Sequence, residues 1–306
     1  MRWTATLVVM TALALTLGAC GGGSNTDTDP APLAQKPIRI GTKNFTEQYI
    51  LGELYSQALK AKGIMVENKG KIGSTEITHR ALAAGALDMY PEYMGVLLSE
   101  IADKIDRPKS SAEAYKIAQD YEERAGMTLL QASPFSNANV LVVKPAFARS
   151  HGLRSIADLK RLKGPVRLAA FPEFRNRYEG LTGLRRRYGL RNLKLLALED
   201  GKARYPSLDS GKVDVTVGFT TDGQLSGDGY VLLTDPRGVF AAGHAAPVIK
   251  RDVLEAHGPG LAATIDAVTA KLTTAIMRRM NKAVDIEGQK PAEVAARFLR
   301  MHGLVR

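Results

Sequence analysis

The sequence predicts an α/β fold of two lobes, in which helices flank a mixed, mainly parallel sheet in each lobe. Three observations predict this architecture. Strand-like and helical segments alternate from residue 37 to residue 95, and a similar pattern starts again after residue 153. The roughly 270 residues from residue 37 onward are enough for one large domain or for two lobes of ordinary size. No repeat of fixed period is present, which argues against a solenoid or a propeller.

In the first part of the chain the expected order is strand, helix, strand, helix, strand. Residues 37–42 alternate as in a strand, residues 47–62 have apolar side chains at helical spacing, and a strand at 64–69 precedes a helix that ends at Gly85. Ligands of such sheets bind beyond the carboxyl ends of the strands, where Lys43, Thr75 and Tyr93 emerge. Pro91 argues against a regular strand interior between residues 88 and 95.

The second set of strands and helices predicts where the chain passes from one lobe to the other. Strands are expected at 140–143, 166–170, 193–198 and 213–217, a return strand at 246–249, and helices in the tail from 261 to 300. We therefore assign residues 37–138 and 244–306 to lobe 1 and residues 139–243 to lobe 2. Two crossings form a paired hinge that suits closure over a small molecule.

The amino-terminal segment is typical of an exported lipoprotein. A positive start and a short apolar run end at Cys20, which is the only cysteine, so we expect a signal peptide over residues 1–19 and lipidation of Cys20. Residues 20–36 contain little to bury and predict a flexible tether. The predicted location is therefore extracytoplasmic, anchored by lipid to the cell membrane on the periplasmic or outer face.

The usual signatures of enzymes are missing from the sequence. It has no Gly-x-Ser-x-Gly elbow, no His-Glu-x-x-His motif and no phosphate-binding loop, and its five histidines lack metal-ligand spacing, so we expect no catalysis, no metal and no cofactor. Asp222 could serve acid–base chemistry, but an Asp-Gly pair after a strand favours a turn. The net charge of +11 is read as a solvated basic surface and not as a nucleic-acid site, because an exported protein meets little nucleic acid.

Four segments carry a resemblance to a known family. They are 40–48 (IGTKNFTEQ), 73–75 (GST), 87–95 (LDMYPEYMG) and 219–223 (FTTDG). In this order they resemble the substrate-binding proteins of ABC importers for glycine betaine, choline, carnitine and related quaternary amines. The resemblance covers residues 38–304 and implies a two-lobed periplasmic-binding-protein fold, type II-like, that works as a monomer with a membrane permease.

The resemblance also implies a set of ligand-binding residues. In the family a box of aromatic rings holds a trimethylammonium group, which only ring faces and shape can recognise. The matching box positions are Tyr93, Asn139, Phe219 and Gly243, so only two of the four are aromatic. The resemblance implies that Lys43 and Arg177 hold a ligand carboxylate, and Glu76 either faces a ligand cation or caps a helix.

The two missing rings leave several alternatives open. One of four further side chains could complete the box: Tyr90, Tyr178, Tyr205 or His244, of which His244 is included in the expected site. If none does, the ligand is bound weakly or is another carboxylate-bearing molecule with more hydrogen-bonding groups. Two other functions compete with solute import, namely a receptor that senses its ligand without transport and a hydrolase or transferase on the same scaffold.

Overall fold

The computed structural model describes residues 36–102, 108, 110–240 and 243–306 of the chain. The predicted signal peptide, Cys20 and the tether up to residue 35 lie outside the described residues. Within the described residues, no helix combines the length and the apolar character that a membrane span requires.

The first sheet has six strands, with β2-β1-β3-β11-β4 in spatial order and β5 paired to β11. β1 runs parallel to β2 and β3, whereas β11 is antiparallel to β3, β4 and β5. The sheet is mixed, as predicted. Fewer of its strand pairs are parallel than expected, because the returning strand β11 pairs antiparallel with all of its neighbours. The bounds are β1 (Ile38–Lys43), β2 (Val66–Gly73), β3 (Met89–Tyr93), β4 (Met127–Leu129), β5 (Ser136–Asn137) and β11 (Gly243–Lys250).

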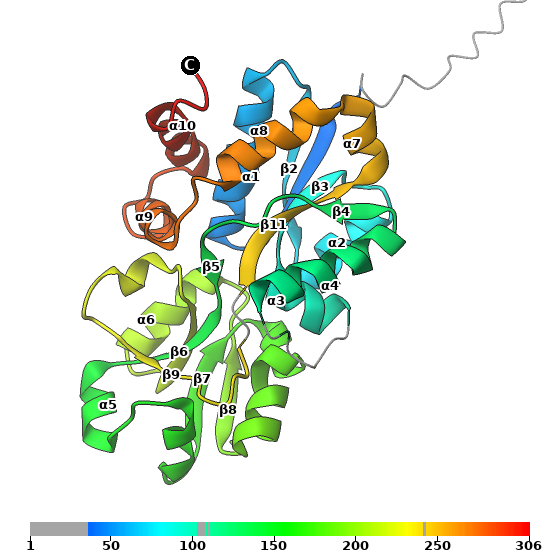
Figure 1. Cartoon of the computed structure of the whole chain (residues 1–306). Helices are drawn as coiled ribbons and strands as arrows, with labels where there is room; N and C mark the ends of the chain where they lie inside the picture. Colours follow the sequence, from blue (N-terminus) through cyan, green and yellow to red (C-terminus); the bar gives the residue numbers. More distant parts are fainter. Residues whose placement is uncertain (1–35, 103–107, 109, 241–242) are drawn as a thin grey trace, which may run out of the picture. The chain divides into compact units, whose positions relative to one another are not determined.

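Helices cover both faces of this sheet (Figure 1). Met89 packs with the helices α1, α8, α9 and α10, while its neighbour Tyr90 packs with α2, η2 and α4, as the alternation of side chains along a strand requires. Both sides of the sheet are therefore core. The bounds are α1 (Thr46–Ala61), α2 (Thr75–Ala83), α3 (Met94–Val96), η2 (Leu97–Ile101), α4 (Ser111–Arg124), α7 (Arg251–His257), α8 (Pro259–Thr269), α9 (Thr274–Asp285) and α10 (Pro291–Met301).

The second sheet has five strands in the order β10-β6-β9-β7-β8, with parallel pairing of β7 to β8 and β9 and antiparallel pairing of β6 to β9 and β10. Leu141 and Val143 pack on one face of this sheet, and Val142 packs on the other. The strand bounds are β6 (Asn139–Val143), β7 (Val166–Ala170), β8 (Leu193–Ala197), β9 (Val215–Phe219) and β10 (Val231–Leu233).

Most helices of this second part are short. The bounds are α5 (Pro145–His151), η3 (Ile156–Arg161), η4 (Pro172–Arg175), η5 (Tyr178–Thr182), η6 (Leu184–Tyr188), η7 (Gly201–Ala203), α6 (Arg204–Asp209) and η8 (Gly223–Ser226). The chain enters the second sheet with Asn139, the first residue of β6, and rejoins the first sheet with Gly243, the first residue of β11. The lobe boundaries themselves stay a prediction.

Pro91 lies inside a strand, so the prediction of an irregular segment at this position is wrong. It occupies the middle of β3 and faces Pro247 of β11. The carbonyl oxygen of Pro91 accepts a hydrogen bond from Gln48 Nε2 at 3.0 Å, and that of Pro247 accepts one from the Leu130 amide at 2.9 Å. Both carbonyls point away from the facing strand, so the two prolines form a non-hydrogen-bonded pair that needs no N–H across the ladder.

Candidate functional site

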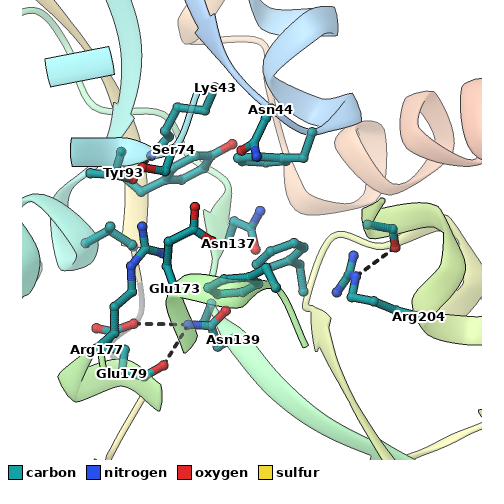
Figure 2. Close-up of a pocket in the computed structure, with 18 of the residues that line it drawn as sticks. Lys43, Asn44, Ser74, Tyr93, Asn137, Asn139, Glu173, Arg177, Glu179 and Arg204 are labelled. Carbon is teal, nitrogen blue, oxygen red and sulfur yellow. Dashed lines mark hydrogen bonds between the residues drawn. The ribbon is translucent and has the colours of Figure 1, made fainter. Parts of the chain in front are cut away.

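A cavity of about 100 Å³ lies where the carboxyl ends of strands from both sheets meet (Figure 2). Strands β1, β2 and β3 of the first sheet lead into its lining, as do β7, β8 and β9 of the second. The lining comprises Lys43, Asn44, Phe45, Ser74, Thr75, Tyr93, Val96, Asn137, Ala138, Asn139, Phe171, Glu173, Arg177, Glu179, Glu199, Gly201, Arg204, Phe219 and Gly243.

Four aromatic side chains line the cavity, two of which the sequence had indicated. The expected rings are Tyr93 and Phe219, and the additional ones are Phe45 and Phe171. The Phe45 centroid lies 6.0 Å from that of Tyr93 and 5.5 Å from that of Phe219, with interplanar angles of 30° and 28°. Phe171 stacks on Phe219 at 6.3 Å and 16°. The four rings therefore form one continuous stack that draws on both sheets.

Buried hydrogen bonds fix the orientation of Tyr93. Its side chain is 4% exposed, and its hydroxyl donates to Glu47 Oε1 at 2.7 Å. Asn137 Nδ2 and Asn281 Nδ2 also donate to the Glu47 carboxyl group, at 2.9 and 2.8 Å. Burial raises the pKa of Glu47, and these hydrogen bonds act in the opposite direction. The ring is thus held from behind by a polar cluster outside the aromatic stack.

Lys43 lies at the end of β1 and is almost fully buried, with 3% of its surface exposed. Its ammonium group is paired with Glu92, donates to Thr75 Oγ1 at 3.0 Å and lies 4.7 Å from the centroid of the Tyr93 ring. Burial lowers the pKa of Lys43, while the charge of Glu92 opposes that change. Three groups of the chain therefore already surround this ammonium.

Arg177 forms an ion pair with Glu76 of α2, which directly follows the lining residues Ser74 and Thr75. Its Nε lies 3.1 Å from Glu76 Oε1, and its Nη2 lies 2.9 Å from Oε1 and 3.0 Å from Oε2. Glu76 Oε2 also accepts from the Ser74 hydroxyl at 2.6 Å. Burial by itself would raise the pKa of Glu76, but the charge of Arg177 and the Ser74 hydrogen bond hold it below its ordinary value. Glu76 is therefore the partner of Arg177.

Arg204 is a further basic residue of the lining that the sequence had not indicated. Its Nε donates to the Gly201 carbonyl at 2.9 Å, and its Nη1 donates to the Val217 carbonyl at 2.5 Å. Its guanidinium carbon lies 4.7 Å from the centroid of the Phe219 ring, and its Nη2 lies 3.6 Å from Asp222. Asp222 in turn accepts from Tyr205 and from the Phe219 amide, which fits a structural turn.

Both non-aromatic box positions, Asn139 and Gly243, line the cavity. Asn139 Nδ2 lies 3.4 Å from the carbonyl of Glu179 and 3.5 Å from its carboxyl group. A Cβ atom at Gly243 would lie 3.1 Å from the Asn137 carbonyl and 3.3 Å from Tyr93 Cβ, so this position is too tight for a ring without movement of its neighbours. Phe45 and Phe171 supply rings from other elements instead.

His244 does not reach this cavity. It follows Gly243 on β11, and successive side chains on a strand point to opposite faces. Its Nδ1 lies 2.8 Å from the Ser133 carbonyl, in a separate hollow that Met94 and Asp266 also line. The other three side chains considered for the box, Tyr90, Tyr178 and Tyr205, are likewise outside the lining. Of the seven side chains expected at the site, five line the cavity and Glu76 reaches it through Arg177.

Comparison with known proteins identifies the family. Residues 36–301 match the family described as the substrate binding domain of the ABC-type glycine betaine transport system. The chain belongs to this family.

Individual members of the glycine betaine family resemble most of the chain. A glycine-betaine-binding protein of Pseudomonas aeruginosa is 34% identical over 286 residues, which cover 90% of this chain and 91% of the relative. The structure of apo YehZ from Escherichia coli has 29% identity and a TM-score of 0.65 over 88% of this chain and 100% of the other. A structure described as a glycine betaine/carnitine/choline ABC transporter has 26% identity and a TM-score of 0.70, covering 87% of this chain and 99% of the other.

Membership in the glycine betaine family confirms the predicted class of protein. The chain is the substrate-binding component of a glycine betaine-type ABC transport system and not an enzyme. Two sheets with flanking helices, and the likeness to solved binding proteins of this type, confirm the predicted fold class. Substrate-binding components of ABC importers work outside the cytoplasm, which agrees with the extracytoplasmic part of the expected location, while the lipid anchor stays a prediction. Among the residues that the structure describes, no group of three or more His, Cys, Asp or Glu side chains could hold a metal ion.

Phe45 and Phe171 were not predicted as site residues, although their positions in the sequence indicate a role. Phe171 directly follows β7, and Phe45 lies two residues beyond the end of β1. A search for aromatic residues at the carboxyl ends of strands would have found both. The family box positions alone did not, because these rings come from neighbouring turns.

Proposed function

We propose that this chain is a lipid-anchored receptor that binds a small quaternary amine of the glycine betaine or choline type in the cavity and delivers it to a membrane permease. The single observation that carries the proposal is the stack of four aromatic rings at the meeting edge of the two sheets. A quaternary ammonium has no hydrogen-bond donor, and each ring face that it contacts contributes roughly 0.5–2 kcal/mol.

The proposed ligand site contains the residues that line the cavity and one that acts through a neighbour. Tyr93, Phe219, Phe45 and Phe171 offer ring faces, and Asn139 offers an amide. Lys43 and Arg177 lie next to the Tyr93 and Phe171 rings. Glu76 takes part through its ion pair with Arg177. His244 is left out of the proposed site because it lies in the other hollow.

In this proposal the cavity is the ligand-binding cleft between two lobes. Residues 37–138 and 244–306 form one lobe in this proposal and residues 139–243 the other. The lining supports the division, since Lys43 and Tyr93 come from the first sheet and Phe171 and Phe219 from the second. Closure on a ligand would bring the two sets of side chains around it.

A direct binding experiment tests the ligand assignment. The purified protein is titrated calorimetrically with glycine betaine, choline, carnitine and other betaines, and Tyr93→Ala is titrated in parallel. Binding of at least one of these amines to the wild type, weakened at least about tenfold in Tyr93→Ala, is the expected result. Absence of binding across the whole panel at millimolar concentration, with the protein folded, would overturn the assignment.

Anchoring and delivery need separate tests. Mass spectrometry of the mature amino terminus should find a lipid-modified Cys20, and Cys20→Ser should release the protein from the membrane fraction. Uptake of the bound amine should require both this chain and its permease. A signal that changes with ligand while uptake does not would favour the sensing receptor instead.

A further inference from the structure

We propose that the site prefers a quaternary ammonium that carries no carboxylate, and that Glu76 sets this preference by occupying Arg177. The inference rests on the proposed function, which assigns a quaternary amine to the cavity, and it narrows the ligand from a betaine to a net cation such as choline. The resemblance to the family had implied that Lys43 and Arg177 hold a ligand carboxylate.

The guanidinium of Arg177 already binds a carboxylate of the chain. An arginine recognises a carboxylate with two N–H groups on one edge of its guanidinium. In this chain Nε and Nη2 make that two-point contact with Glu76, at 2.9–3.1 Å. The hydroxyl of Ser74 donates to the same carboxyl group at 2.6 Å and holds it in place. A ligand carboxylate would have to displace Glu76 from an arranged ion pair.

The other basic residues of the lining are Lys43 and Arg204. The ammonium of Lys43 is paired with Glu92 and is 3% exposed, so it has little surface to offer a ligand. Nε and Nη1 of Arg204 donate hydrogen bonds to the carbonyls of Gly201 and Val217. The basic side chains that line the cavity thus already have partners within the chain.

Acidic side chains around the cavity exceed the basic ones that they neutralise. Lys43, Arg177 and Arg204 lie beside the carboxyl groups of Glu92, Glu76 and Asp222. Glu173 and Glu179 line the cavity in addition, and the carboxyl group of Glu173 has no hydrogen-bond or ion-pair partner among the described residues (Figure 2). The acids therefore outnumber the bases around the cavity. This excess attracts a cation and repels a ligand that brings its own carboxylate.

Choline and glycine betaine make a matched pair of probes. Both carry a trimethylammonium group and differ in whether a hydroxymethyl group or a carboxylate completes the molecule. The aromatic rings should bind the trimethylammonium groups of the two ligands with the same energy. The difference between the two affinities therefore reports on the charge around the cavity. A preference of the rings alone would leave the two ligands equal.

The experiment is calorimetric titration of both ligands against the full chain, its Glu76→Gln variant and a control variant, Glu67→Gln. Wild type should bind choline at least about tenfold more tightly than glycine betaine. Glu76→Gln releases Arg177 and should raise the affinity for glycine betaine about tenfold, with little gain for choline. Glu67 is an exposed carboxylate on β2 paired with Lys69, so Glu67→Gln should leave the affinity ratio unchanged.

Each outcome decides between the two proposals. Tighter or equal binding of glycine betaine by the wild type overturns the inference and leaves the proposed function intact. An unchanged ratio in folded Glu76→Gln overturns the role of Glu76. Failure of both ligands to bind the folded wild type removes the proposed function and the inference with it. If Glu76→Gln does not fold, the ratio measured on the wild type still tests the preference.

Discussion

The ring of Phe45 stacks on the ring of Phe219, with centroids 5.5 Å apart and an interplanar angle of 28°. Phe45 follows β1 of the first sheet and Phe219 ends β9 of the second, so this contact joins the two sheets at the cavity. The two residues are 174 positions apart in the sequence, so only the folded chain brings their rings together.

Removing the Phe45 ring should lower the ligand affinity and have little effect on the stability of the fold. Phe45→Leu keeps an apolar side chain and removes one cation-binding face, so the affinity for a quaternary amine should fall by about one order of magnitude. Titration calorimetry measures the affinity and thermal unfolding checks the fold. Phe147→Leu is the control, because Phe147 makes a tilted ring contact with His151 of α5 and does not line the cavity. Equal loss in both variants would contradict a role for Phe45 in the site.

The hydroxyl and the ring of Tyr93 should have separable effects. Tyr93→Phe keeps the ring but removes the donor to Glu47, which should cost about 1–3 kcal/mol of unfolding free energy because a buried acceptor loses its partner. Its affinity for a quaternary amine should stay within a few-fold of wild type, whereas Tyr93→Ala should lose most binding. Urea unfolding and calorimetry together make the comparison. Loss of binding in Tyr93→Phe would show that the hydroxyl and not the ring recognises the ligand.

The buried carboxyl group of Glu47 predicts a pH dependence of stability. Because burial raises its pKa, folded Glu47 holds its proton more tightly than unfolded Glu47 does. Its contribution is therefore fully present below the unfolded pKa and is lost as pH rises through the raised folded pKa. Glu47→Gln cannot titrate, so the stability of wild type relative to this variant should fall as pH rises above the ordinary glutamate pKa of about 4.3.

Urea unfolding at several pH values measures this difference. The same series on Glu67→Gln is the control, since the Glu67 side chain is 48% exposed on β2. A wild-type stability that rises relative to Glu47→Gln over this range would show that the three donors around Glu47, and not its burial, dominate.

Gly223 should tolerate no side chain. A Cβ atom there would lie 2.5 Å from Lys282 Cα and 2.6 Å from its backbone nitrogen, so η8 and α9 would have to move apart. Gly223→Ala should therefore lower the unfolding free energy by about 2 kcal/mol or more. Gly227→Ala is the matched control, since no heavy atom lies within 4 Å of the corresponding position. Thermal unfolding of the two variants should differ clearly, and equal midpoints would contradict the close contact.

The periodicity of the sequence predicted most of the strands and helices, because apolar side chains repeat with the geometry of the element that buries them. The strand at 166–170 was predicted with the bounds that β7 has. Pro91 misled the prediction because a proline is excluded from a strand only where its missing N–H is needed, and the facing Pro247 removes that need. The pairing of two prolines 156 positions apart is a property of register, which local sequence does not carry.

Which residues stand at the carboxyl ends of strands could be read from the local pattern of side chains, and Lys43, Tyr93 and Phe219 all line the cavity as a result. The contacts of these residues depend on the folded arrangement of both sheets. His244 points away because Gly243 faces the cavity, and Arg177 is held by Glu76, which lies 101 residues earlier. Backbone propensities act over a few residues, whereas ion pairs and ring stacks between two sheets form only where both sheets fold and meet.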